Sequence, residues 1–464
     1  MLSRSCRPAP IGFFRPTFRP LLHCNMDALA KATTVRFGKA VMRLVHSLDS
    51  TSPGAPRPPR GPRKPLKFGL NLSAFRSRDF RLYLFGNAFS LQAMWIQRIT
   101  FAWLAWQMSG SAAFVGLVAF LGFAPTMLSG PVFGALIDRV PLLPAARTAQ
   151  ALLFALALLT AGLHAAGLLG QGTLAALALG YGVVMSAHHP VRMSLAPLLA
   201  PRGSISSVIA TTSINFNLAR SIGPALGGAL IHAGGPGAAL WVVAACLLPY
   251  QIVLRLLRPR ERAPLDEAPG SLLHGLAQGL RYAWRDRFTR LILLLTGGFA
   301  LLGRGMLEIL PLVADGLFAR GPTGLGTLTS VAGLGALAAA ALVIALPAPL
   351  PGRVPRASLV SAGLGVALTL VVALSRNWPV TVAAVAALGG AGTVLGVSVQ
   401  SALQQALADG YRGRVMSLWV MTGIGGSALG ALLLGGLADA LGLAWAAAIV
   451  LALAALPLSM ARAR

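Results

Sequence analysis

The stretch RLLRPRERAPLDEAPGSLLHGLAQGLRYAWRDRFTR, residues 255–290, decides how this chain is organised. It is the long polar interruption after residue 82, and it divides the remaining chain into two apolar parts of nearly equal length. Each part contains about six hydrophobic runs close to the ~20 residues that a helix needs to cross a bilayer. The sequence therefore predicts an all-α polytopic membrane protein with about twelve transmembrane helices.

Four regions follow from this division. We expect a basic N-terminal arm over residues 1–81, a first group of helices over 82–257, a loop with an amphipathic helix over 258–290, and a second group over 291–464. The expected spans are 84–108, 112–137, 145–169, 174–198, 208–232, 238–257, 291–314, 324–346, 357–374, 379–407, 415–437 and 441–460.

Composition excludes several classes of protein. With 56% hydrophobic and 11% charged residues, the chain has too little polar surface for a soluble globule of this size. The net charge of +27 does not indicate nucleic acid, because 16 of the 39 basic residues precede residue 82 and most others lie in short loops between apolar runs. No phosphate-binding GxxxxGK[ST] loop, CxxC pair, HExxH or GxSxG motif occurs. We therefore expect neither an enzyme nor a bound cofactor or metal.

The N-terminal arm, residues 1–81, is rich in arginine and proline and poor in acidic residues, a composition typical of disorder. It also suits a processed targeting segment. An equally simple alternative is that the true start of the protein is Met26 or Met42.

Arginine distribution predicts the orientation in the membrane. After residue 81, the loops on the side of the N-terminus, together with the C-terminal tail, contain 17 arginines, and the opposite loops contain two, Arg320 and Arg376. Cytoplasmic loops are the arginine-rich ones, so both termini are expected in the cytoplasm. In the central loop, Leu272, Leu276, Leu280 and Trp284 fall four apart, which predicts an amphipathic helix on the inner membrane surface.

Polar side chains inside the spans are candidate functional residues, because each costs about 2.5–3.5 kcal/mol to insert at the bilayer centre. They are Gln97 and Arg98 in the first span, His188, His189 and Arg192 in the fourth, Arg304 and Glu308 in the seventh, and Gln400, Ser401, Gln404 and Gln405 in the tenth. Since these are every third span, we expect the four helices to line a shared wet cavity that binds substrate. The alternative is that the polar groups only hydrogen-bond between helices.

Glu308 is the acidic residue that lies well inside a span, so it is a candidate proton site. Arg304 lies four residues earlier, which places both side chains on one helical face and equally favours a structural ion pair. The adjacent histidines, His188 and His189, diverge by about 100° around a helix and do not predict a metal site.

The two halves resemble each other in sequence. RDFRLYL from Arg78 is matched by RDRFTRLIL from Arg285, and GPALG from Gly223 by GSALG from Gly426. Such offsets indicate a duplicated six-helix unit. Small residues at four-residue spacing predict close helix contacts, and the candidates are Gly130 with Gly134, Gly223 and Pro224 with Gly227, and Gly426 with Gly430.

GALIDR from Gly134 resembles the G-x-L-x-D-R signature of the major facilitator superfamily, although most of the basic residues that follow it there are missing here. WIQRITFAWL from Trp95, NFNLARSIGPALGG from Asn215, GRGMLEILP from Gly303 and RGRVMSL from Arg412 resemble the branch that contains the enterobactin exporter. The similarity runs from about residue 74 to the end of the chain.

The resemblance implies two six-helix bundles, a central cavity and alternating access by rocking of the bundles. It also implies a gate at Gly134, Asp138 and Arg139, in which Asp138 contacts the start of the eleventh helix and a basic residue of the fourth, here Arg192.

The expected function is a secondary transporter in the plasma (inner) membrane, acting as a monomer. It would export a small organic molecule, siderophore- or drug-like, in exchange for protons. A channel or a lipid scramblase is the alternative, against which the duplicated halves and Asp138 argue.

Overall fold

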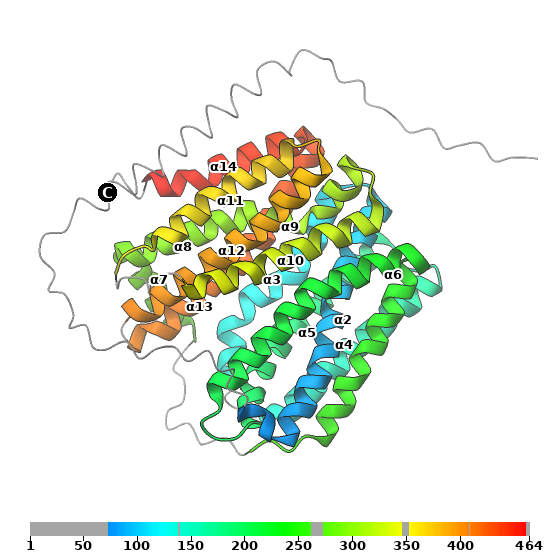
Figure 1. The fold of residues 1–464 in the computed structure, drawn as a ribbon, viewed down its shortest axis with the longest axis vertical. Coiled ribbons are helices and arrows are strands. Elements are labelled where there is room, and N and C mark those ends of the chain that lie inside the picture. Colours follow the sequence, from blue (N-terminus) through cyan, green and yellow to red (C-terminus); the bar gives the residue numbers. More distant parts are fainter. Residues whose placement is uncertain (1–72, 138–139, 261–271, 346–351, 408, 461–464) are drawn as a thin grey trace, which may run out of the picture. The chain divides into compact units, whose positions relative to one another are not determined.

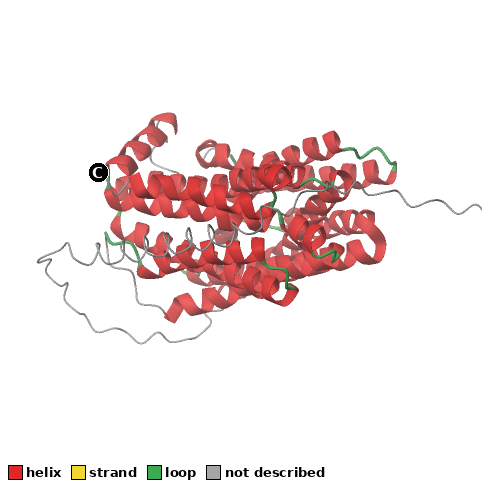
Figure 2. Cartoon of the chain, turned by 90° about the horizontal axis from the view of Figure 1, so that it is seen from above, coloured by secondary structure: helices red, strands yellow, loops and turns green. Residues whose placement is uncertain are grey.

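The computed structural model describes residues 73–137, 140–260, 272–345, 352–407 and 409–460 (Figure 1). Within these ranges the chain forms helices and loops and no strand (Figure 2). The first 72 residues of the expected N-terminal arm, and Asp138 and Arg139 of the expected gate, lie outside the described residues.

The first half of the described chain holds six spans in five long helices. After the short 3-10 turn η2 (Ser73–Arg76), they are α2 (Arg78–Ser109), α3 (Ala112–Ile137), α4 (Leu142–Ala165), α5 (Gln171–Leu198) and α6 (Ile205–Leu256). The last of these is two spans joined at Gly235, whose φ of 75° and ψ of 175° are not helical. Glycine is suited to this position because it has no Cβ to oppose a positive φ. We call α2–α6 the N-bundle.

The second half holds six more spans. Their elements are α8 (Arg287–Phe299), η3 (Ala300–Arg304), α9 (Gly305–Glu308), η4 (Leu312–Leu317), α10 (Gly321–Ala345), α11 (Arg356–Leu374), α12 (Trp378–Ala406), α13 (Asp409–Leu441) and α14 (Leu443–Met460). We call this set the C-bundle. About twelve spans in two six-helix bundles result, as predicted.

The seventh span differs from the single regular helix expected over 291–314. α8 passes into the π-helical turn η3, then into α9, which ends at Glu308, and the chain continues into a second π-helical turn, η4. Pro311 has no N–H to donate and its ring disfavours a regular turn before it. π-Helical turns are frequent at functional sites, and here they flank Glu308.

The amphipathic helix predicted in the central loop is α7 (Leu272–Arg285). It packs on α13, where the Tyr282 ring stacks on that of Tyr411 with centroids 4.7 Å apart. Leu280 and Trp284 remain exposed. These two side chains are thus available to the lipid interface that the sequence predicts for them.

The helices alternate in direction, so their turns gather at two ends. The end that contains the turns at Gly110, Gly167, Gly235, Gly321 and Gly442 is called the distal end, and each of these glycines has a positive φ. The end that contains the turn between α5 and α6 and the helix α7 is called the proximal end. By the arginine asymmetry, the proximal end is the one expected in the cytoplasm.

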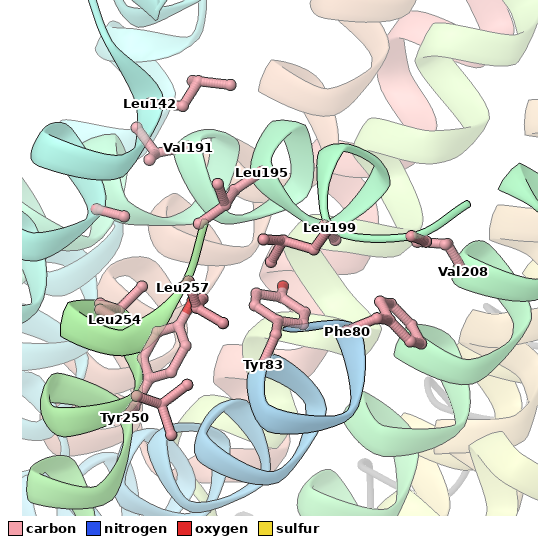
Figure 3. Close-up of a cluster of buried hydrophobic side chains, with 14 of the residues drawn as sticks. Phe80, Tyr83, Leu142, Val191, Leu195, Leu199, Val208, Tyr250, Leu254 and Leu257 are labelled. Atoms are coloured by element: carbon pink, nitrogen blue, oxygen red, sulfur yellow. The ribbon is translucent and has the colours of Figure 1, made fainter. Parts of the chain in front are cut away.

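The interior of the N-bundle is apolar near the proximal end (Figure 3). Tyr83 of α2 and Tyr250 of α6 meet edge to face, 5.9 Å between centroids, beneath Leu195 of α5. In contrast, large apolar side chains such as Trp241 and Ile252 are exposed. A surface of this kind is stable in lipid and not in water, as expected for a protein with eight described helices long and apolar enough to span a membrane.

Candidate functional site

The ion pair between Arg98 and Glu308 joins the two bundles in the middle of their spans. Arg98 lies on α2, and Glu308 is the last residue of α9; the Arg98 guanidinium donates a hydrogen bond to the Glu308 carboxylate. Ser427 of α13 donates a second hydrogen bond to the same carboxylate, at 3.5 Å. The Glu308 side chain is 9% exposed and that of Arg98 is 38% exposed, so the pair is accessible from the Arg98 side.

Two aromatic rings hold the Arg98 guanidinium. Its central carbon lies 5.1 Å from the Trp95 ring centroid and 4.9 Å from that of Phe123 on α3. Both distances allow a cation–π attraction, which fixes the long side chain in the direction of Glu308. The N-bundle therefore presents Arg98 to the C-bundle in one defined position.

The expected pair between Arg304 and Glu308 is not formed, which corrects the prediction from their spacing. An arginine placed before a glutamate at i, i+4 is the weaker orientation on a helix, and Arg98 from the opposite bundle occupies the carboxylate instead. The Arg304 guanidinium extends between α12 and α13, where its two terminal nitrogens lie 3.9 Å from the positions that a Cβ would take at Gly396 and Gly423. Its side chain is exposed.

Arg220 belongs to the same cluster and was not among the residues predicted for the site. It lies in the first part of α6, and it interacts electrostatically with Arg98, Arg304 and Glu308. Its carbonyl oxygen is against α10, 2.9 Å from where a Cβ on Gly333 would be. A charged residue in the middle of the fifth span was the signal that could have identified it.

Several predicted cavity residues instead face the interior of the N-bundle. Gln97 and His188 are 1% and 2% exposed. The His188 ring packs edge-on against Tyr250, and neither of its nitrogens has a hydrogen-bond partner among the described residues. Arg192 is buried and donates to Asn87 Oδ1 of α2 at 3.4 Å. The sequence showed that His188 and Arg192 share one face of the fourth span. It did not show which neighbouring helices this face contacts.

The remaining predicted polar residues lie on the accessible parts of α5 and α12. His189 and Gln404 are exposed, and Gln400 is half-buried. Gln405 donates to Ser401 Oγ on its own helix at 3.0 Å. Of the predicted polar residues, the structure thus joins Arg98 and Glu308 in an ion pair. Arg304 and the unpredicted Arg220 interact with this pair electrostatically.

At the predicted packing glycines, neighbouring helices come very close. A Cβ on Gly223 would lie 2.6 Å from Trp95 Cβ, and one on Gly227 would lie 2.4 Å from Ile99 Cγ2, both on α2. A Cβ on Gly430 of α13 would lie 2.0 Å from the Leu301 carbonyl oxygen. The other positions behave alike: Gly426 approaches Ala300, and the Pro224 carbonyl approaches Gly326 of α10.

Of the expected gate, Gly134 lies within α3, and Arg192 makes the contact with Asn87 given above. The contacts of Asp138 and Arg139 lie outside the described residues.

A second set of contacts joins the bundles at the distal end. The carboxylate of Asp439, near the end of α13, accepts hydrogen bonds from Ala112 N and Ala113 N at 2.9 Å and from Ser111 Oγ at 2.5 Å. An acidic residue of the C-bundle thus caps the N-terminus of α3 in the N-bundle. The sequence showed Asp439 only as an acidic residue near a span end.

A further distal contact involves the end of the seventh span. Trp106 Nε1 of α2 donates to Asp315 Oδ2 of η4 at 2.8 Å. Together with Asp439, it holds the distal ends of the bundles against each other in this structure.

Comparison with known proteins identifies the family. A family model described as transmembrane secretion effector matches residues 70–463. The chain belongs to this family of the major facilitator superfamily. It is a transmembrane transporter and an integral membrane protein, not an enzyme.

The chain is similar to several named transporters. It is 29% identical over 391 residues to the multidrug efflux pump Tap of Mycobacterium tuberculosis, covering 78% of this chain and 87% of that protein. It is 27% identical over 374 residues to Tap of Mycolicibacterium fortuitum, covering 74% and 85%. Its fold matches an inward-facing bacterial homologue of the human lysosomal transporter Spinster with a TM-score of 0.64, at 14% identity, covering 83% and 97%.

Proposed function

We propose that this protein is a proton-coupled exporter of small organic molecules that works by alternating access as a monomer in the plasma membrane, with both termini in the cytoplasm. Similarity to the multidrug efflux pumps Tap supports export of drug-like compounds, and the resemblance to the enterobactin exporter branch adds siderophore-like compounds as candidates. The two bundles are the moving bodies.

The cross-bundle ion pair is the observation that carries the proposal. Arg98 and Glu308 are 210 positions apart in the chain and meet between the bundles. Protonation of Glu308 removes the negative charge that Arg98 contacts. It therefore changes the free-energy difference between arrangements of the bundles in which the pair is made and arrangements in which it is broken.

Opening of the distal end requires the contacts of Asp439 and Asp315 to break. Substrate enters from the proximal side while these contacts are made, and it leaves on the distal side after they are lost. The polar cluster around Arg98 and Glu308 lies between the bundles and is therefore alternately exposed to either side.

The test is export from an efflux-deficient bacterial strain that expresses the full chain. Retention of a panel of antibiotics, dyes and siderophores is measured inside and outside the cell, with the pH gradient intact and after its collapse by nigericin. We expect exported compounds to accumulate inside when the gradient is collapsed. We expect Glu308→Gln to reduce gradient-driven export at least tenfold, whereas Asp79→Asn, the same chemical change at the proximal start of α2, has no effect.

Two results would contradict the proposal. Export that continues unchanged after nigericin and valinomycin together, which collapse the pH gradient and the membrane potential, would exclude proton coupling. Passage of compounds in both directions at rates proportional to their concentration, without saturation, would indicate a channel instead, and movement of labelled lipids between leaflets would indicate a scramblase.

A further inference from the structure

The central cluster contains an excess of positive charge. Three arginines, Arg98, Arg220 and Arg304, interact electrostatically with a single carboxylate, that of Glu308. Three positive charges and one negative leave a formal charge of +2 in the cluster. Charged groups inside a membrane are rare unless they have a partner or a function.

Arg98 is the arginine that pairs with the negative charge of Glu308. It makes the ion pair with Glu308 and stacks against Trp95 and Phe123. Arg220 and Arg304 have no hydrogen-bond or ion-pair partner among the residues that the structure describes. Within the described part of the chain, two guanidinium groups of the cluster therefore share the single Glu308 carboxylate with Arg98 and have no ion-pair partner of their own.

Arg304 is placed to receive a ligand. Its side chain is exposed although it stands in the middle of a span, next to the glycine positions of α12 and α13, Gly396 and Gly423. The absence of side chains at these glycines leaves room beside the guanidinium. A guanidinium has a planar set of donors that matches the oxygens of a carboxylate or a phosphate, often with two parallel hydrogen bonds.

The surroundings of the cluster are apolar and partly aromatic. Trp95 and Phe123 flank Arg98. Trp95 is buried, whereas Phe123 is partly exposed. A ligand that contacts both this surface and the arginines combines an apolar or aromatic body with an acidic group. A lipophilic cation, in contrast, is repelled by the unpaired arginines.

From these observations we propose that the substrates of the exporter carry an acidic group, a carboxylate or a phosphate, which binds to Arg304 and Arg220 while the apolar body lies along Phe123. This inference rests on the proposed export function and names the substrate class of the same site.

The binding test uses dyes that differ in one carboxyl group. Fluorescein and its methyl ester, and rhodamine 110 and its methyl ester rhodamine 123, are titrated against the purified full chain in detergent, with fluorescence anisotropy as the readout. We expect each acid to bind at least tenfold more tightly than its ester. Arg304→Gln should reduce this ratio to below threefold, Arg304→Lys should retain part of it, and Arg376→Gln, at the distal surface, should leave it unchanged.

Equal binding of acid and ester, or an acid preference that survives Arg304→Gln, would overturn the inference. Size-exclusion profiles and melting temperatures of the variants establish that they are folded. If Arg304→Gln does not fold, Arg220→Gln and Arg304→Lys provide the same comparison.

Transport separates this inference from the proposed function. Export of rhodamine 123 but not rhodamine 110 from cells, unaffected by Arg304→Lys, would retain the exporter and overturn the acidic substrate class. Export of no compound in the panel would overturn the exporter itself.

Discussion

At the scale of single residues, the partner of Glu308 determines what the carboxylate can do. An ion pair within one helix moves with that helix, whereas the pair with Arg98 connects two bundles. Removal of one member of a buried pair typically costs about 3–5 kcal/mol. Here we expect a smaller loss, because Arg98 is 38% exposed and the pair is therefore only partly buried.

A double-mutant cycle tests this pair. We expect Arg98→Gln and Glu308→Gln each to lower the melting temperature of the purified protein, and the double variant to recover part of the loss because neither charge is then left alone. Arg304→Gln combined with Glu308→Gln is the matched control. A larger coupling free energy between Arg304 and Glu308 than between Arg98 and Glu308 would show instead that the ion pair forms within the seventh span.

A substitution at His188 tests whether this residue is a core side chain or contacts substrate. Its imidazole is 2% exposed, without a partner for either nitrogen among the described residues. An unsatisfied buried polar group costs about 1–3 kcal/mol. His188→Phe, which keeps a planar ring beside Tyr250, should therefore leave the melting temperature unchanged or raise it, and export should persist. Loss of export by a folded His188→Phe variant would show that the histidine takes part in transport.

At the scale of helices, the capping of α3 by Asp439 is a contact between an element of one bundle and an element of the other. Helix capping is normally local in sequence, with the cap residue adjacent to the helix it stabilises. Here cap and helix are more than 300 positions apart, so the contact exists only while the distal ends are together. It stabilises one arrangement of the bundles selectively.

The Asp439 cap predicts a shift in conformation. Loss of a side-chain cap costs about 0.5–2 kcal/mol, which corresponds to a change of about two- to thirtyfold in the ratio of two states. Asp439→Ala should increase the population with separated distal ends by that factor, measured as a longer distance between spin labels on Gly172→Cys and Arg376→Cys.

Asn377→Ala is the control for this experiment. Asn377 caps α12 within its own bundle at the same end, with its Oδ1 accepting from Val380 N at 3.2 Å. Its removal should therefore leave the distance distribution unchanged. Identical distributions for Asp439→Ala and the parent protein would show that this cap does not control opening.

At the scale of the whole molecule, the orientation in the membrane follows from loop charge. The proximal loops and the C-terminal tail hold the arginines, and the distal loops hold Arg320 and Arg376. In intact cells expressing a cysteine-free parent, Gly170→Cys should react with a membrane-impermeant maleimide, and Ala268→Cys should react only after the cells are opened. The reverse pattern would place the distal end in the cytoplasm.

Short motifs such as GALIDR from Gly134 indicated the family by resemblance. The order of apolar and polar residues by itself determined the number of spans, the polar interruption at residues 255–290 and the amphipathic helix. These properties are local or additive along the chain, because transfer into lipid depends on the hydrophobicity of about twenty consecutive residues. The four-residue spacing of glycines also located close helix contacts, since a missing side chain permits close approach whatever helix is opposite.

Only the tertiary structure decided which polar residues meet. The spacing of Arg304 and Glu308 allowed an ion pair between them. A helical face does not specify which side chains of other helices it contacts, however, and Arg98, 210 positions away in the chain, pairs with the Glu308 carboxylate. By the same reasoning, His188 and Arg192 lie inside the N-bundle, and Asp439 caps a helix in the opposite half of the chain. Partners of this kind are fixed by the packing of whole bundles, because the summed packing of many apolar side chains outweighs any single pairing preference between residues close in the sequence.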